Sequence, residues 1–271
     1  MFDYTRYLRK DKFPHIWCPG CGNGTLLKAL IRAIDKLGLE KDSIAMVSGI
    51  GCSSRTPGYV DFNTLHTTHG RPIPFAAGIK AANPKMNVIV VTGDGDGTAI
   101  GGNHFIHNAR RNIDITVLLF NNRTYGMTGG QASPATLVGD FATTAPYGSI
   151  DQPFDICKLA EASGASFVSR CTTYHTTMLP SLIEKAIKKK GFSLVEIYTQ
   201  CPTYYRGKGK RTSATEMINE YKNTCIKVEA AKKMSPEELN DKTVVGILCD
   251  KDLPEYLDQY QKKIINVARK K

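Results

Sequence analysis

The stretch of sequence that decides the fold begins with Val88-Ile89-Val90-Val91 and continues into the turn Gly93-Asp94-Gly95-Asp96-Gly97. The first four residues are apolar and mostly β-branched, which predicts a strand buried on both faces. Residues 102–111 then predict a helix, and residues 115–120 predict a second buried strand that ends at Asn121-Asn122. This strand–helix–strand unit should have a right-handed crossover. Both polar motifs therefore lie at the carboxyl ends of parallel strands, where open α/β sheets bind ligands.

The polar residues at this edge suit a metal ion and a diphosphate. Asp94 offers a carboxylate oxygen and Asn122 an amide oxygen, which are ligands for Mg²⁺ or Ca²⁺, and Mg²⁺ is often shared with phosphates. Gly93 and Gly95 let a diphosphate come close to backbone N–H groups. The start of the next helix adds a field that favours an anion. A Gly/Asp turn alone is as readily structural, but Asn-Asn one strand later favours a binding site.

The flanking segments continue the alternation of strands and helices. The long loop at 121–153 has little periodicity, which is typical of a functional loop. The sequence as a whole predicts an α/β fold with a mostly parallel sheet and helices on both faces. Further strands are expected at 44–47, 166–169, 193–198 and 244–248, and further helices at about 26–37, 72–82, 154–163, 177–189, 214–229 and 254–268.

Length and charge narrow the class of protein. The 271 residues are enough for one large α/β domain. No apolar run approaches a membrane span, and residues 1–6 lack an apolar signal region, so we expect a cytoplasmic protein. The net charge is +11, but no basic run is interleaved with aromatic residues. We therefore expect an acidic protein partner and neither nucleic acid nor membrane.

Eight cysteines in a cytoplasmic chain indicate metal or redox chemistry before disulfides. Cys18 and Cys21 form a C-x-x-C turn ahead of a helix, and Cys52 and Cys201 follow strands on the edge that carries Asp94. Four converging thiolates suit Zn²⁺ or a 4Fe–4S cluster; spacing does not choose, although the adjacent diphosphate site favours redox. A thioredoxin-like dithiol is the rival reading of the C-x-x-C, but no strand precedes it. The cysteines expected to be ordinary thiols are Cys157, Cys171, Cys225 and Cys249.

The motifs resemble those of a known family. The segments GDGD (93–96), GGNHFI (101–106) and NNRTYGMTGGQ (121–131) resemble the thiamine diphosphate motif. More narrowly, the chain is similar to the β subunit of 2-oxoacid:ferredoxin oxidoreductases over about residues 4–206. The resemblance is strongest at 13–24, 49–55, 66–71 and 93–136. It implies a thiamine diphosphate-binding fold in residues 1–206, with 207–271 as a charged C-terminal extension packed on the same domain.

The resemblance also implies roles for residues. Asp94, Asn122 and the backbone oxygen of Thr124 would hold Mg²⁺, and the four cysteines Cys18, Cys21, Cys52 and Cys201 would hold a 4Fe–4S cluster. Met127, Thr128 and Gly129 would line the substrate pocket. The residues expected to bind the cofactor are Ile50, Gly51, Cys52, Ser53, His69, Gly93, Asp94, Gly95, Asp96, Asn122, Thr124, Tyr125, Gly126, Met127 and Thr128. His69 and Arg71, ahead of a helix, would lie near phosphate oxygens.

The implied reaction is oxidative decarboxylation of a 2-oxoacid with CoA, with electrons passing to ferredoxin, as in anaerobic metabolism. Residues 17–24 and 125–131 look most like the 2-oxoglutarate enzymes, and pyruvate and branched-chain 2-oxoacids stay open. The glutamate that activates the cofactor would come from an α subunit with a pyrimidine domain, so we expect an obligate heteromer. Two rival hypotheses are a non-redox split thiamine decarboxylase and a non-enzymatic zinc or nucleic-acid module.

Overall fold

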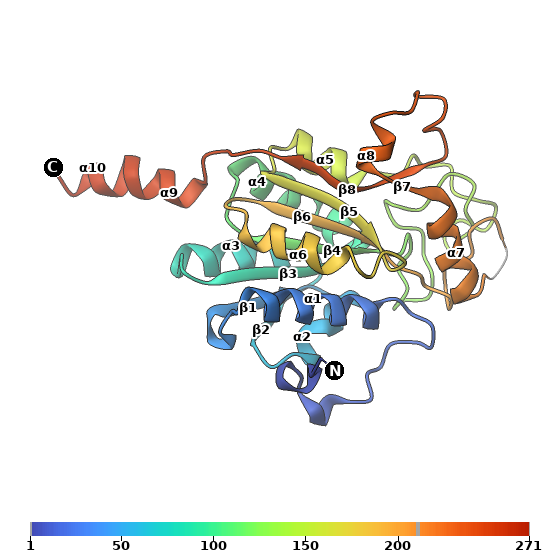
Figure 1. Ribbon diagram of the computed structural model, residues 1–271, viewed down its shortest axis with the longest axis horizontal. Coiled ribbons are helices and arrows are strands. Elements are labelled where there is room, and N and C mark those ends of the chain that lie inside the picture. Colours follow the sequence, from blue (N-terminus) through green and yellow to red (C-terminus); the bar gives the residue numbers. More distant parts are fainter. Residues whose placement is uncertain (1, 210–211, 271) are drawn as a thin grey trace.

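The computed structural model describes residues 2–209 and 212–270, which contain one eight-stranded sheet with helices on both faces (Figure 1). The strands are β1 (Ile44–Ser48), β2 (Asn63–His66), β3 (Asn87–Gly93), β4 (Thr116–Asn121), β5 (Phe167–Thr172), β6 (Ser193–Tyr198), β7 (Cys225–Lys227) and β8 (Thr243–Asp250). Their order is β2-β1-β3-β4-β6-β5-β8-β7, and the paired neighbours are parallel except for β5 and β8. This confirms the predicted α/β class.

Two hydrophobic cores lie on opposite faces of the sheet, because successive strand residues point to opposite sides. In β1, Ile44 and Met46 join the core under one pair of helices, while Ala45 and Val47 join the core under three others. Burying one leucine or isoleucine side chain contributes roughly 1.5–3 kcal/mol. The first pair is α1 (Asn23–Leu37) and α6 (Leu179–Lys188); the other three are α3 (Pro72–Ala82), α4 (Gly102–Arg111) and α5 (Ile156–Ala162).

Helix α1 fixes the position of the C-x-x-C segment. Its buried face includes Leu26, Leu30 and Ile34, as the apolar spacing predicted, and Gly38 ends it with φ 63°. At the other end, the backbone N–H of Gly22 donates to the carbonyl of Gln200, 3.3 Å away. The segment that holds Cys18 and Cys21 is therefore tied to the chain that leaves β6.

The predicted helix at 214–229 is confirmed over residues 214–224 and is wrong at 225–227, which form a strand. The structure has α7 (Ala214–Thr224), then strand β7, then the short α8 (Val228–Ala231). Strand β7 pairs in parallel with β8 at the edge of the sheet, and this tertiary pairing overrides the helical preference of a charged segment. Strand β2 was not predicted either, since its sequence Asn-Thr-Leu-His is partly polar and its residues are largely exposed.

The C-terminal segment divides into two parts. Strands β7 and β8 extend the sheet beyond β5, whereas the last helical stretch projects away from the sheet (Figure 1). No helix among residues 2–209 and 212–270 is long and apolar enough to cross a membrane. The last stretch comprises α9 (Tyr256–Tyr260), a π-helical turn (Gln261–Ile265) and α10 (Asn266–Ala268); the remaining elements are α2 (Thr56–Tyr59), a π-helical turn (Asp96–Ile100) and 3-10 turns at Tyr4–Tyr7, Lys10–Lys12, Lys41–Ser43 and Ser53–Arg55.

Candidate active site

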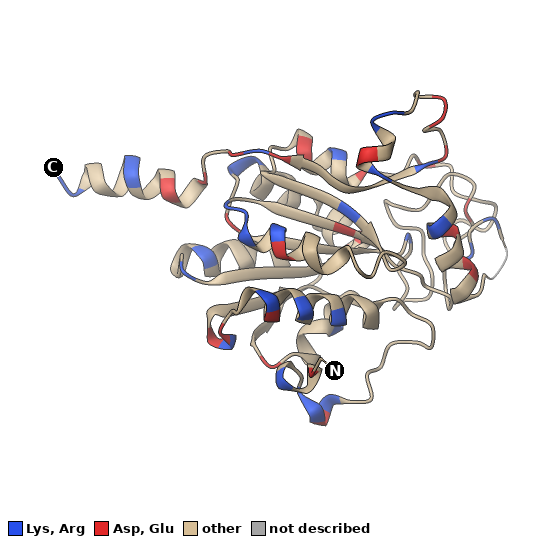
Figure 2. Ribbon diagram, in the orientation of Figure 1, with Lys and Arg blue, Asp and Glu red and all other residues tan. Residues whose placement is uncertain are grey.

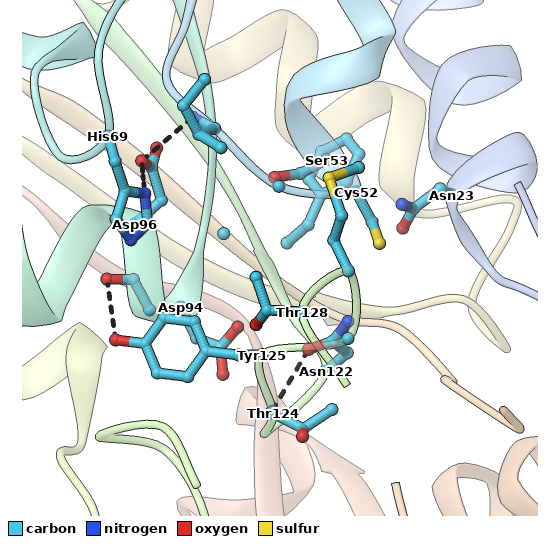
Figure 3. Close-up of a pocket in the computed structure, with 17 residues that line it drawn as sticks. Asn23, Cys52, Ser53, His69, Asp94, Asp96, Asn122, Thr124, Tyr125 and Thr128 are labelled. Atoms are coloured by element: carbon cyan, nitrogen blue, oxygen red, sulfur yellow. Dashed lines mark hydrogen bonds and ion pairs between the residues drawn. The ribbon is translucent and has the colours of Figure 1, made fainter. Parts of the chain in front are cut away.

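A pocket lies at the carboxyl ends of β1, β3 and β4. It holds about 720 Å³ of empty space, a volume that includes open solvent. Every residue that the sequence assigned to cofactor binding lines it. Of the three expected in the substrate pocket, Met127 and Thr128 line it and Gly129 does not. Figure 3 shows that the labelled side chains come from loops far apart in the sequence.

Asp94 is the most unusual group in the pocket. Its side chain follows β3 and the residue is only 3% exposed, yet none of the ion pairs among the described residues involves it. Burial raises the pKa of Asp94 to about 7, although the hydroxyl of Ser133, which donates to its Oδ2, opposes the rise. A buried carboxyl with this environment lacks a compensating positive charge.

Asn122 and Thr124 face the same pocket from the loop after β4 (Figure 3). The side-chain oxygen of Asn122 accepts a hydrogen bond from the backbone N–H of Thr124 at 3.2 Å. The loop closes on itself, because Tyr125 N–H donates to the carbonyl of Gln131 and Gly130 N–H donates to the carbonyl of Tyr125. This short closed loop holds two oxygen-bearing residues on the side of the pocket that faces Asp94.

Asp96 has a different role from Asp94, although only one residue separates them. Its Oδ1 accepts from the backbone N–H of Gly70 at 2.7 Å and of Ile50 at 3.2 Å, and it lies 2.7 Å from His69 Nδ1. Its Oδ2 accepts from the hydroxyl of Thr92 at 2.6 Å. Asp96 therefore ties together three loops that line the pocket, and it fixes the ring of His69 so that Nε2 is the nitrogen able to meet a ligand.

A close contact explains the glycine between these two aspartates. A Cβ atom at Gly95 would lie 2.1 Å from Cε1 of Tyr125, which is too close for any side chain. The hydroxyl of Tyr125 in turn points to the carbonyl of Gly95, 3.5 Å away. The turn after β3 and the loop after β4 are thus pressed against each other, which holds Asp94 opposite Asn122.

Two of the four cysteines predicted as cluster ligands, Cys52 and Cys201, lie beside Gly126. A Cβ atom there would lie 3.4 Å from Cys201 Sγ and 3.7 Å from Cys52 Sγ. The pKa of the Cys21 thiol is raised to about 12, mainly by burial, and the neighbouring Cys201, Cys52 and Cys18 contribute to the rise. The indole N–H of Trp17 donates to the carbonyl of Cys52 at 2.7 Å. Cys52 and Cys201 therefore lie next to the pocket, and Cys18 and Cys21 are close enough to interact with them electrostatically.

The other four cysteines have different surroundings. Cys157, Cys171 and Cys249 are buried and Cys225 is half-buried, and all eight thiols of the chain are free. Within 2–209 and 212–270, no group of three or more His, Cys, Asp or Glu side chains is arranged to hold a single metal ion.

Sequence reasoning missed three residues of the site. Asn23 and Phe120 line the pocket, and Ser133 donates to Asp94 at 2.5 Å. Asn23 directly follows the C-x-x-C turn, so its place at the edge was a usable signal; Ser133 lies far along an irregular loop and has none. Arg71 does not line the pocket: its guanidinium points to the carbonyls of Gly70 and Ile100.

The fold and the site together define a class of protein. A parallel sheet whose carboxyl edge carries a glycine-rich turn, a buried carboxylate and amide and carbonyl oxygens is a domain that binds a diphosphate cofactor. A family model described as "Thiamine pyrophosphate enzyme, C-terminal TPP binding domain" matches residues 49–197, so the class is that of the thiamine diphosphate-binding domains.

Individual relatives identify the family more narrowly. A 2-oxoglutarate synthase subunit KorB from Methanothermobacter marburgensis is 53% identical over 94% of this chain and 90% of its own length. Its counterpart from Methanocaldococcus jannaschii is 52% identical over 97% and 98%. A solved 2-oxoglutarate:ferredoxin oxidoreductase from Magnetococcus marinus, with 2-oxoglutarate, coenzyme A and succinyl-CoA bound, superposes with a TM-score of 0.87 at 32% identity, covering 97% of this chain and 90% of that one. This chain belongs to the 2-oxoacid:ferredoxin oxidoreductase family and is similar to the KorB subunits of 2-oxoglutarate synthases.

Proposed function

We propose that this chain binds thiamine diphosphate through a Mg²⁺ ion held by Asp94, Asn122 and the carbonyl oxygen of Thr124. The observation that carries the proposal is the buried carboxyl of Asp94, which has no cation beside it among the described residues and shares its pocket with the other two. A divalent cation here would favour the ionised carboxylate, and the three oxygens match what Mg²⁺ prefers. The donor set therefore fits the ion.

The remaining residues of the pocket bind and orient the cofactor. Backbone N–H groups of the turn at 93–97 would meet the diphosphate, and His69, held by Asp96, would present Nε2 to the ligand. Ile50, Phe120 and Met127 give the pocket an apolar lining, which limits access of water to the reacting atoms. When bound, thiamine diphosphate supplies the carbanion chemistry that releases CO₂ from a 2-oxoacid.

The proposed overall reaction is conversion of 2-oxoglutarate and CoA to succinyl-CoA, CO₂ and a proton, with two electrons passed to ferredoxin, in either direction. The relatives named above support this substrate, since two are 2-oxoglutarate synthase subunits and the solved relative holds 2-oxoglutarate, coenzyme A and succinyl-CoA. Met127 and Thr128, at the mouth of the pocket, are the residues of this chain that we assign to contact with the 2-oxoacid.

Electrons would leave through a 4Fe–4S cluster on Cys18, Cys21, Cys52 and Cys201. Cys52 and Cys201 lie beside Gly126, next to the pocket, and Cys21 interacts electrostatically with the other three cysteines, which supports this assignment. The position next to the cofactor pocket gives the cluster a redox role.

Two kinds of partner complete the proposal. An α subunit would supply a pyrimidine domain and the activating glutamate, since this chain carries the single thiamine diphosphate-binding domain that the family model matches. The chain carries a net charge of +11. An acidic ferredoxin would therefore be attracted to it as the electron acceptor. In Figure 2 the positions of Lys and Arg are coloured blue along the outer helices and the C-terminal stretch, where their charges would attract ferredoxin.

Trp17 offers a direct test, because it is the only tryptophan and it contacts the pocket residue Cys52. Its fluorescence should change in a saturable way when thiamine diphosphate is added with Mg²⁺, and much less when either is added alone. With the α subunit present, turnover of 2-oxoglutarate should exceed that of pyruvate. A chain that binds no thiamine diphosphate, or that turns over 2-oxoacids without a partner, would contradict the proposal.

A further inference from the structure

An ion pair lies inside the sheet on the face covered by α5. Figure 2 shows blue on β5 beside red on β6, and the charged residues of these strands are Arg170 and Glu196. Arg170 Nε lies 2.7 Å from Glu196 Oε2, and their side chains are 10% and 1% exposed. Arg170 Nη2 also contacts Asp155, which caps the start of α5. Charges so deeply buried call for an explanation.

Stability alone does not explain the pair. Replacing a buried ion pair by apolar residues of similar volume is often neutral or stabilising, because desolvation offsets the attraction. The bonding of Glu196 suggests another reason. Oε2 is occupied by Arg170 and by the thiol of Cys157 at 3.2 Å, while Oε1 accepts a hydrogen bond from Asn121 Nδ2 at 2.8 Å. The carboxylate thus connects β6 to the last residue of β4.

Glu196 fixes the orientation of the Asn121 amide. A carboxylate only accepts hydrogen bonds, so the amide must turn its NH₂ group toward Glu196 and its oxygen away. That oxygen accepts from the backbone N–H of Arg123 at 3.0 Å. Arg123 has φ 59°, a left-handed conformation that few residues with side chains adopt. The Asn121 side chain therefore holds the backbone in a turn that it would otherwise leave easily.

This turn carries the two proposed metal ligands of the loop after β4. Asn122 and Thr124 lie on either side of Arg123 and line the pocket, whereas Asn121 and Glu196 do not line it. We propose that Glu196, held by Arg170, is a positioning residue that acts through Asn121 to present Asn122 and Thr124 to Mg²⁺. The inference rests on the proposed Mg²⁺ site and adds residues that never touch the ion.

The sharpest test is Glu196→Gln. A glutamine has one oxygen for two donors, Arg170 Nε and Asn121 Nδ2, so one donor must face another donor. If the Asn121 amide rotates, the bond to the Arg123 N–H is lost. Asn121→Ala removes the same link but leaves the ion pair intact. Both variants should need about 10-fold or more Mg²⁺ for half-saturation of thiamine diphosphate binding, as is typical when a residue that supports a metal ligand is changed.

The matched control is Asp114→Asn, which breaks another largely buried ion pair, that with Lys80, at the opposite ends of the strands. Binding is followed by calorimetry and by Trp17 fluorescence, and unfolding by its midpoint temperature. The proposal expects the control to lower the midpoint without changing the Mg²⁺ requirement. It is overturned if Glu196→Gln and Asn121→Ala bind Mg²⁺ like the parent, or if the control shifts the requirement as much as they do.

The same titration separates this proposal from the Mg²⁺ assignment itself. If Asp94→Ala and Asn122→Ala bind thiamine diphosphate with the parent's Mg²⁺ requirement, the metal site is wrongly assigned and the positioning role falls with it. If those two variants lose binding while Glu196→Gln and Asn121→Ala keep it, the metal site stands and the positioning role alone is refuted.

Discussion

The carboxylates at the two ends of the strands differ in whether a cation lies beside them. At the amino ends, Asp114 precedes β4 and is paired with Lys80 at 2.8 Å and Lys190 at 3.3 Å. At the carboxyl ends, Asp94 follows β3, is more deeply buried, and has no cation among the described residues to pair with. A charge that the chain itself neutralises supports the fold, whereas one left without a partner in a pocket marks the place of a ligand.

Cys52 and Cys157 can be compared in the same way, and their substitution should give the largest difference in activity. Cys52 lies at the pocket and interacts electrostatically with the thiols of Cys18, Cys21 and Cys201, whereas Cys157 is on the buried face of α5, against Glu196. Cys52→Ser should abolish the low-temperature paramagnetic resonance of the reduced protein, and with it ferredoxin reduction. Anaerobic parent protein should contain about four irons per chain.

Cys157→Ser is the matched control and should keep both the iron and the signal. One zinc per chain in the parent, or a Cys52→Ser variant that reduces ferredoxin at the parent rate, would refute the redox assignment. The non-redox split decarboxylase would then be the better account.

Charges exposed on the surface should respond to salt, unlike the buried charges at either strand end. Steered association can be faster by roughly 10- to 1,000-fold and weakens as ionic strength rises. We therefore expect the rate of reduction of an acidic ferredoxin to fall steeply between low and high salt, while thiamine diphosphate binding changes little. A ferredoxin reduction rate that does not depend on salt would contradict electrostatic steering by the basic surface.

The pH dependence of metal-free stability sharpens the contrast further. Burial raises the pKa of Asp94 to about 7 from an ordinary value of 3.8. The folded state thus disfavours the ionised carboxylate of Asp94. The contribution of Asp94 to the free energy of unfolding is therefore highest below the pKa of the unfolded chain, and it is lost as pH rises through the raised pKa of the folded state. Asp94→Asn should be more stable than the metal-free parent at pH 8 by roughly 2–4 kcal/mol, and the difference should shrink at pH 5. Denaturant unfolding at both pH values measures this; an equal difference at both would count against it.

Breaking the ion pair between Asp114 and Lys80 should have the smallest effect, and it should change only the free energy of unfolding. Asp114→Asn leaves Lys80 largely buried beside a neutral group, which should cost about 1–3 kcal/mol of unfolding free energy, less than for a fully buried pair because Asp114 is partly accessible. Denaturant unfolding gives this value. An accompanying loss of thiamine diphosphate binding would show that the two strand ends are not independent.

The strands of the central sheet could be predicted because the sequence pattern that marks each strand lies within the strand itself. Strands buried on both faces appear as short apolar runs such as Val88–Val91, and the turns at their carboxyl ends carry the polar motifs. Strand β2 could not be found in this way, since Asn63–His66 pairs on one side with β1 and stays largely exposed. Strand β7 has three residues inside a charged segment, and only pairing with β8 makes it a strand.

The site was predictable where a residue directly follows a strand and not where it comes from an irregular loop. Asp94 and Asn122 follow β3 and β4, so topology alone places them together. Ser133 reaches Asp94 from the long loop, and nothing in its neighbourhood signals this contact. The hydrogen bond between Glu196 and Asn121 could not be predicted either. A charged residue in an apolar strand does not indicate which of its oxygens will accept from which neighbour.

The role of Asp94 as a metal ligand is tested most directly when Asp94 and Asp114 are compared in one binding experiment. Thiamine diphosphate binding is measured by calorimetry at a fixed Mg²⁺ concentration for the parent, Asp94→Ala and Asp114→Asn. We expect Asp94→Ala to weaken binding by more than the roughly 10- to 100-fold that a supporting residue costs, while Asp114→Asn binds like the parent. Parent-like binding by Asp94→Ala would contradict it.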